Sequence, residues 1–376
     1  MQTVFKTVAF AVILLTFLIT SCAASVKILT STTRIKPDQI MEIDINRSGY
    51  VDQVIPFSMK QQEGYFIVAS GPNQIHSVDS SNHVDSFMLN IAMSSKWMTM
   101  GVVETCVGGL FTPQYNLLNL VYSGEELGKS YIVQVNLKNL TQIVEVISLG
   151  ANSQVIDVHE NRELSVLHIL VKKAQSLSLF TFDPKNNLLR EQGYPLMTTG
   201  KVAFMKDTGI FVGIGNSTYS HLLLVDPYSL KIIDGQDLDS FGIFNIQSLS
   251  CFNSMISIVY SKFATRNIVY RYEAASKALY SMGGLFYATI KRFSNCEMFS
   301  DQAKVVCVNN NREIVKVPIS SNEETNYYPI ESAENDLSKA FTQMDDEGQL
   351  LLYIPQNYAT DDGSFRIAVY NYAKFE

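Results

Sequence analysis

One hairpin unit recurs along the chain at nearly constant spacing, and this repeat constrains the fold more than any other feature. Its clearest copy runs from His221 to Leu238, where an apolar run leads into Asp226-Pro227 and a second one begins at Leu230. Apolar runs on both sides of an Asp-Pro-x-Ser turn predict an antiparallel hairpin, because the aspartate can accept hydrogen bonds from backbone amides that follow it. Weaker copies are marked by the turn residues Asn136, Asp183, Glu273 and Pro318. The turns are 43 to 47 residues apart, a length typical of a repeat of four strands.

Short alternating strands separated by turns account for most of the chain, and scarcely any segment has a helical pattern. They fall into six groups of four, at 50–90, 96–149, 154–194, 201–238, 244–282 and 289–330. The second group contains an insertion at 106–115, CVGGLFTPQY, which we expect to be a loop. The sequence therefore predicts an all-β chain.

A last group, from Ala340 to Tyr372, has only three strands. Sheets arranged in a closed ring leave no long open edge, so this last group needs a fourth strand to match the other groups. The segment 39–46, QIMEIDIN, has the required alternation, and we expect it to pair beside 365–372. The count is then seven four-stranded sheets in a single domain, 25–376. Six or eight sheets remain alternatives, because the lead-in 26–37 and the insertion could each hide or mimic a strand.

This repeat resembles the β-propeller superfamily, in particular quinoprotein-like and YVTN-type propellers, whose outer hairpins carry an apolar-x-apolar-Asp turn. The resemblance implies a seven-bladed β-propeller of four-stranded blades, with the ring closed by the N-terminal strand. It indicates no specific family. Trp97 is the only tryptophan, so the Trp-Asp dipeptide of WD40 repeats is absent. Two Gly-Gly-Leu-Phe segments, at 108–111 and 283–286, lie at different points of their repeats, and we interpret both as loops and not as kelch motifs.

The N-terminal 24 residues have the composition of a secretion signal, with Lys6 followed by an apolar run over 7–21. Small residues allow cleavage after Ala23 or Ala24. In an alternative reading the four residues ending at Cys22 resemble a bacterial lipobox, and Cys22 would anchor the chain through a lipid; an uncleaved anchor is a third reading. No later stretch reaches about 18 uninterrupted apolar residues. We therefore expect a secreted protein without a membrane span in its mature chain.

Four cysteines follow the signal, at Cys106, Cys251, Cys296 and Cys307. Cys296 and Cys307 flank a predicted hairpin turn, so we expect a disulfide between them, which would stabilise the fold by about 2 to 3 kcal/mol. The alternative for this pair is two buried free thiols. A second bond, from Cys106 to Cys251, would have to bridge distant repeats.

Three Asn-x-Ser/Thr sequons lie in predicted turns, at Asn46, Asn139 and Asn216. We expect them to accept glycans if the source is eukaryotic, although asparagine favours turns in any case. The chain is 47% hydrophobic and 17% charged, which indicates a folded protein. Its formal net charge of -7, without a Lys/Arg block, disfavours nucleic acid and anionic membranes as partners.

No pattern of an active site stands out, so we assign no catalytic, cofactor-binding or metal-binding residue. The strongest candidate is Asp157-Val158-His159-Glu160 at the end of a predicted innermost strand. Asp157 and His159 would share one face of that strand, but two ligands do not make a metal site. Loose candidates for one divalent metal at the mouth of a central channel are Asp157, His159, Asp207, Glu297 and Asp345.

We therefore expect a secreted, monomeric and non-catalytic propeller that binds a protein or glycan on one face of the ring. The alternative is a metal-dependent propeller hydrolase or lactonase, which needs several polar side chains converging from different repeats. A structural coat or matrix component is a third hypothesis.

Overall fold

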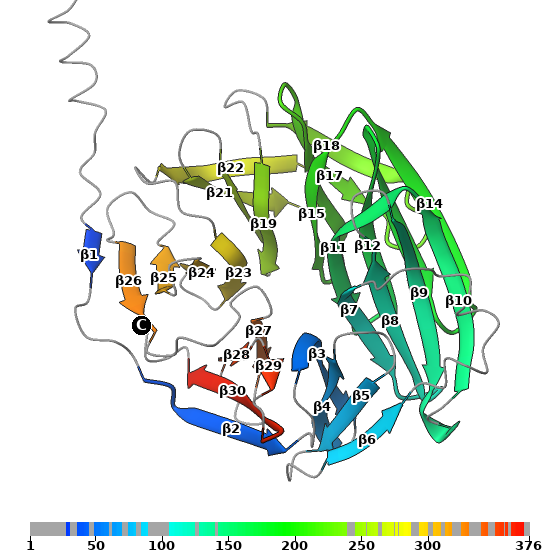
Figure 1. Ribbon diagram of the computed structural model, residues 1–376. Helices are drawn as coiled ribbons and strands as arrows, with labels where there is room; N and C mark the ends of the chain where they lie inside the picture. The colour runs from blue at the N-terminus through cyan, green and yellow to red at the C-terminus, as the bar shows by residue number, and fades with distance from the viewer. Residues whose placement is uncertain are drawn as a thin grey trace, which may run out of the picture.

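Figure 1 shows a computed structural model of the chain. The structure describes residues 28–30, 36–44, 49–59, 62–69, 74–79, 84–88, 105–124, 128–139, 142–238, 245–252, 254–261, 265–273, 275–276, 278–286, 293–299, 304–309, 313–317, 325–330, 340–344, 350–356, 358–359 and 362–371. The signal segment 1–24, Asn46 and Asp345 lie outside these ranges. Within them every element is a strand except a short 3-10 turn at Leu137–Asn139, which confirms the all-β prediction.

The strands of the described residues form seven sheets, which we number in chain order. Sheet 1 contains β3 (Gly49–Met59), β4 (Gln62–Ala69), β5 (Gln74–Asp79) and β6 (Val84–Met88). Sheet 2 contains β7 (Thr105–Thr112), β8 (Leu117–Ser123), β9 (Lys129–Asn136) and β10 (Gln142–Ala151). Sheet 3 contains β11 (Ser153–Asn161), β12 (Val166–Lys173), β13 (Ser176–Asp183) and β14 (Leu188–Pro195).

The later sheets follow the same antiparallel order. Sheet 4 contains β15 (Thr199–Met205), β16 (Gly209–Gly215), β17 (Ser220–Val225) and β18 (Ile232–Asp237). Sheet 5 contains β19 (Asn245–Phe252), β20 (Met255–Ser261), β21 (Thr265–Glu273) and β22 (Ala278–Phe286). Sheet 6 contains β23 (Phe293–Phe299), β24 (Lys304–Asn309), β25 (Glu313–Val317) and β26 (Thr325–Pro329). Sheet 7 contains β27 (Phe341–Met344), β28 (Leu350–Pro355), β30 (Ser364–Asn371) and β2 (Gln39–Asp44).

The sheets follow one another around a common centre, with the first strand of each sheet innermost (Figure 1). First strands of neighbouring sheets contact one another from β3 to β23. Each sheet buries its apolar side chains against those of the neighbouring sheet. Leu110 of sheet 2, for example, belongs to one core with Ile169 and Phe180 of sheet 3. The repeated turn residues of the sequence mark the end of the third strand of sheets 2 to 6, as Asp183 does for β13.

The N-terminal segment completes sheet 7, as the sequence predicted. Strand β2 pairs antiparallel with β30, and Ile43 lies opposite Phe365 with both side chains buried. A second link comes from β29 (Tyr358–Ala359), which pairs with Gly49 and Tyr50 at the start of β3. One core is shared by sheets 7 and 1. The first and last parts of the chain are therefore joined by backbone pairing and by packing.

The predicted loop insertion at 106–115 is wrong. Residues Thr105–Thr112 form β7, and a tight turn over 113–116 leads into β8. The two glycines that suggested a loop are required by close packing. A Cβ on Gly108 would lie 2.8 Å from Val158 of sheet 3, and one on Gly109 would lie 2.7 Å from the carbonyl oxygen of Asn119. The second Gly-Gly-Leu-Phe segment is also in a strand, β22.

The lead-in to the closing strand also forms structure. Strand β1 (Ile28–Thr30) pairs in parallel with β26 and makes sheet 6 five-stranded. Among the residues that the structure covers, no helix is both long enough and apolar enough to cross a membrane.

Candidate functional site

The most polar innermost strand is β11, and a bulge sets the direction of its side chains. The bulge interrupts the pairing with β12 between Val155 and Asp157. Beyond it, Asp157 reaches sheet 4, whereas Val158 packs on Gly108 of sheet 2. A bulge re-aims the side chains that follow it, so β11 presents polar groups to both neighbouring sheets.

Asp157 uses both carboxylate oxygens to join sheet 3 to sheet 4. Its Oδ1 lies 2.8 Å from Nζ of Lys201, and its Oδ2 accepts a 2.8 Å hydrogen bond from the backbone N–H of Val202. Both partners belong to β15, and Val202 is buried. The arrangement satisfies a backbone donor on the inner edge of sheet 4 that has no strand beside it. Asp157 is thus a bridge between sheets.

The same kind of bridge joins sheets 1 and 2. Asp52 sits in a bulge of β3, and its Oδ2 accepts a 3.3 Å hydrogen bond from the N–H of Cys106 in β7. The next residue, Gln53, donates from Nε2 to the carbonyl oxygen of Val107 at 3.2 Å. Bulges at the corresponding place interrupt β7, β19 and β23 as well. In β3 and β11 a polar residue at the bulge thus bonds the free inner edge of the next sheet.

His159 stacks on a second histidine inside sheet 3. The ring centres of His159 and His168 are 6.4 Å apart, with 15° between the ring planes. Nδ1 of His168 lies 2.9 Å from the hydroxyl oxygen of Thr181. Burial lowers the pKa of His159 to about 4 and that of His168 to about 3, so both imidazoles are neutral near pH 7.

Glu160 is a carboxyl whose proton affinity is altered by its surroundings. It is half-buried, accepts a hydrogen bond from the N–H of Gly109 in sheet 2, and has an oxygen 3.4 Å from the guanidinium of Arg162. Burial raises its pKa to about 7, against the opposing effect of Arg162. A carboxyl with this pKa can exchange a proton at neutral pH.

Cys106 is near Glu160 but is not a ready nucleophile. Its thiol is buried and donates to the carbonyl oxygen of Gly108 at 3.5 Å. Burial raises the pKa of this thiol far above its usual value, and the charges of Asp52 and Glu160 raise it further. The thiolate, which is the reactive form, is therefore disfavoured here.

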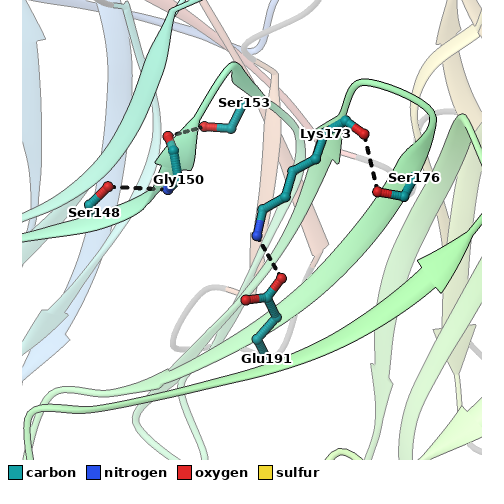
Figure 2. A network of polar contacts seen from close by, with 6 residues as sticks. All are labelled: Ser148, Gly150, Ser153, Lys173, Ser176 and Glu191. Carbon is teal, nitrogen blue, oxygen red and sulfur yellow. Dashed lines mark hydrogen bonds and ion pairs between the residues drawn. The ribbon is translucent and has the colours of Figure 1, made fainter.

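A further polar network lies where sheet 2 leads into sheet 3 (Figure 2). Lys173 crosses the ring of Phe180 and places Nζ 2.6 Å from Oε1 of Glu191. Glu191 is partly desolvated, which by itself would raise its pKa, yet the bonds from Lys173 and Ser178 hold that pKa below its usual value. Ser148 and Ser153 bind the backbone of Gly150, and Ser176 binds that of Lys173 (Figure 2). These contacts stabilise turns and join strands.

Of the five loose metal candidates from the sequence, Asp345 lies outside the described residues. Asp157 and His159 do share a face of β11, as predicted. Asp207 lies in the turn between β15 and β16 with a φ of 58°, and Glu297 belongs to β23 in sheet 6. Searching only the described residues finds no group of three or more His, Cys, Asp or Glu side chains placed to hold a metal ion.

The predicted disulfide partners lie opposite one another. Cys296 and Cys307 are paired across β23 and β24, and Cys307 is buried. Neither Cys106 nor Cys251 is in a disulfide, so the second bond that the sequence left open is not formed.

The two described sequons lie at strand connections. Asn139 ends the 3-10 turn after β9. The side chain of Asn216 donates to Leu196 at 2.8 Å and accepts from the N–H groups of Thr218 and Tyr219 at 2.7 Å. Asn216 therefore has a structural role whether or not it carries a glycan.

Sequence reasoning missed the bridging role of Asp52 and the partners of Asp157. The available signal was a charged residue within a predicted first strand, next to apolar neighbours such as Val51 and Val158. The residue that each one bonds lies 54 or 44 positions further along the chain, so it becomes evident only once sheets are neighbours.

Comparisons with known proteins identify the fold of this chain but assign it to no protein family. No protein-family model matches the sequence, and no curated protein matches it. Among solved structures, the Dos1 propeller matches 84% of this chain and 76% of its own, with 9% identity and a TM-score of 0.52. Virginiamycin B lyase from Staphylococcus aureus matches at 10% identity over 88% of this chain and 98% of its own, with a TM-score of 0.53. Kuenenia stuttgartiensis hydrazine synthase matches at 9% identity over 91% and 98%, with a TM-score of 0.57. With the stacked four-stranded sheets, these matches show that the chain has a β-propeller fold.

Proposed function

We propose that this chain is a secreted, seven-bladed β-propeller that binds a protein or glycan partner without catalysing a reaction. In this proposal each sheet is one blade, and β2 closes the ring. Support comes from the pairing of β2 with β30 and from the core that sheets 7 and 1 share.

One observation favours binding over catalysis: two carboxylates of the described inner strands, Asp157 and Asp52, are engaged in contacts that join neighbouring blades. Asp157 has a partner on each oxygen, and Asp52 bonds the backbone of the next sheet. A general base or metal ligand must instead point at a substrate or an ion. Large apolar side chains, by contrast, remain exposed on the outer strands.

The binding proposal is tested with the mature protein, immobilised and probed with a glycan array and with a library of displayed peptides. Saturable binding to a defined glycan or peptide family is the expected result. If neither probe binds above a denatured control, the binding function is wrong.

Secretion is a proposal that rests on the N-terminal 24 residues and on the cysteines. The register of β23 and β24 allows a disulfide between Cys296 and Cys307, a bond typical of oxidising compartments. When the full chain is expressed in a secretory host, we expect to recover the protein from the culture medium without its signal segment. Peptide mapping without reductant should recover Cys296 and Cys307 in one linked fragment. Free thiols at both positions in the secreted protein would contradict the disulfide. Cell-retained protein carrying a lipid on Cys22 would favour the anchored alternative.

The second candidate is an enzyme, as in the metal-dependent hydrolase or lactonase hypothesis. The observation in its favour is Glu160, whose pKa of about 7 suits proton transfer. Two of the similar structures are also enzymes by their titles, a lyase and a hydrazine synthase. The test combines metal analysis of protein purified without chelator with a panel of lactone and ester substrates. One bound metal ion per chain, together with turnover that Glu160→Gln abolishes, would establish the enzyme. Substoichiometric metal would rule out the metal-dependent hydrolase or lactonase.

A further inference from the structure

We propose that the contact surface between sheets 3 and 4, called here the seam, is a pH-sensitive switch. In mildly acidic solution two histidines enclosed in the seam take up protons, and the sheets separate locally. This inference goes beyond the proposed binding function and does not depend on it, because it concerns two neighbouring sheets and needs no partner.

A polar row crosses all four strands of sheet 3 at one level. The strand register pairs His159 of β11 with His168 of β12, His168 with Thr181 of β13, and Thr181 with Arg190 of β14. Residues that lie directly opposite one another in an antiparallel sheet project from the same face. The row therefore runs from the inner strand of the sheet to its outermost strand.

The face that carries this row packs on sheet 4. Leu170, two residues from His168 on the same strand, belongs to one apolar core with Ile210 of sheet 4. At the outer end of the row, the guanidinium of Arg190 donates to the carbonyl oxygen of Tyr228 in sheet 4. The row is thus enclosed in a seam that is otherwise largely apolar.

His168 has only one of its ring nitrogens in a hydrogen bond. Its side chain is fully buried, with 0% exposure. Nδ1 lies 2.9 Å from Oγ1 of Thr181, whereas Nε2 has no hydrogen-bond partner among the described residues. An imidazolium carries an N–H group on both nitrogens, so a proton taken up in the closed seam leaves a buried charge with an unpaired donor. The sheets must part before water can stabilise that proton.

His159 makes protonation of the closed seam still less favourable. It is half-buried, and its ring centre is 6.4 Å from that of His168, so two protonated rings repel one another. Burial lowers the pKa of His159 to about 4, with Asp157 acting against this effect and Arg162 reinforcing it. Burial and the neighbouring His159 lower the pKa of His168 to about 3.

The other charged groups that face the seam have partners of their own. They are Asp157 with Lys201, Glu163 with Lys206, Arg190 with the carbonyl oxygen of Tyr228, His221 with Asp237, and Asp183 and Asp226 with the backbone N–H groups of their turns. Lys172 and Tyr194 lie further along the strands, four residues beyond His168 and Arg190. The described residues therefore offer His168 no carboxylate that is free to pair with it.

Glu160 titrates on the opposite face of sheet 3. It accepts a hydrogen bond from the N–H of Gly109, so it belongs to the contact between sheets 2 and 3. Burial raises its pKa to about 7, so acid strengthens that contact while it weakens the seam. A measurement of global unfolding adds the two effects, and a test of the switch must report on the seam alone.

The direction of the pH effect follows from linkage. In the separated seam the imidazoles regain their ordinary pKa of 6.5, so below that pH the open state binds more protons than the closed one. The closed seam is most stable above pH 6.5 and loses stability as the pH falls from there through the lowered values. Between pH 7 and pH 5, His168 alone shifts the equilibrium toward the open state roughly 25-fold, and His159 adds to this.

The test follows hydrogen exchange of the Val202 N–H, which is bonded across the seam to Asp157. Exchange in the full mature chain is measured at pH 7 and pH 5, and each rate is divided by that of the unfolded chain at the same pH. We expect protection of Val202 to fall roughly 25-fold or more in wild type. The double variant His159→Gln, His168→Gln should lose this dependence, because glutamine forms hydrogen bonds but does not titrate.

The matched control is the N–H of Cys106, which is bonded to Asp52 across the contact between sheets 1 and 2. The described core of that contact contains no histidine, so the protection of Cys106 should change much less. A second measurement needs no variant. Nuclear magnetic resonance of the wild-type imidazoles should show His159 and His168 still neutral at pH 6, where an ordinary histidine is mostly protonated.

Three outcomes would overturn the inference. Unchanged protection of Val202 in wild type would show that the seam does not open in acid. A fall that persists in the folded double variant would assign the effect to another group, such as Asp157. Protonation of both histidines at pH 6 would show that the closed seam tolerates their charge. Neither measurement involves a partner, so each of these outcomes leaves the proposed binding function untouched.

Discussion

The bridge between sheets 3 and 4 predicts that Asp157→Ala destabilises the protein more than the loss of a surface ion pair would. The substitution removes the acceptor for the N–H of Val202, a residue only 4% exposed. Leaving a buried donor unsatisfied costs about 1 to 3 kcal/mol. The ion pair with Lys201 adds at most about 1 kcal/mol, since the two side chains are 16% and 29% exposed. We expect a total loss of about 1 to 4 kcal/mol.

Two matched variants separate these contributions. Asp157→Asn keeps an acceptor for Val202 and should cost about 1 kcal/mol, and Lys201→Ala removes only the ion pair and should cost no more than that. The assay is equilibrium urea unfolding at pH 7, followed by circular dichroism and fluorescence. If Asp157→Ala costs no more than Lys201→Ala, the carboxylate does not satisfy the inner edge of sheet 4, and the bridging role is refuted.

Three further predictions follow from single residues. Gly109→Ala should cost about 1 to 3 kcal/mol, because its Cβ would meet the backbone of Asn119, whereas Gly193→Ala, with nothing within 4 Å, should be nearly neutral; equal unfolding midpoints would contradict this. Asn216→Ala should lower the free energy of unfolding by about 1 kcal/mol because it removes the turn hydrogen bonds, whereas Thr218→Ala should change it very little, although both destroy the same sequon. Equal losses of stability in thermal unfolding would show that the glycan, and not the turn, stabilises the protein. Glu160 has a folded-state pKa of about 7 against an ordinary 4.5, so its contribution to stability is present below pH 4.5 and is lost as the pH rises through 7. Glu160→Gln should therefore become more stable relative to wild type over that interval, and a pH-independent difference would contradict the raised pKa.

Local sequence signals predicted most of the fold because each turn is encoded where it forms. The Asp183 and Asp226 turns bond their own following amides, so a repeat of such turns is visible in the sequence alone. The incomplete last group likewise pointed to 39–46, since a three-stranded edge needs a partner.

Prediction from the sequence was wrong or incomplete where the role of a residue depends on contacts with a neighbouring sheet. Gly108 and Gly109 suggested a loop, because a glycine needed for close packing looks the same in sequence as one needed for a turn. The inner bridges were missed for a related reason. Asp157 resembles an ordinary polar strand residue until the neighbouring sheet brings Lys201 and Val202 beside it.

The pairing of β2 with β30 can be tested directly with a disulfide between Glu42 and Arg366. These exposed residues lie opposite one another, with Oε1 of Glu42 2.8 Å from Nε of Arg366, and directly paired strand residues are spaced suitably for a disulfide. The double variant Glu42→Cys, Arg366→Cys should oxidise within one chain, migrate faster than its reduced form on a denaturing gel, and unfold at a higher temperature. Neither single variant should do so. A double variant that stays reduced, or that links only between two chains, would show that the N-terminal strand does not join the last blade and that the ring is not closed as proposed.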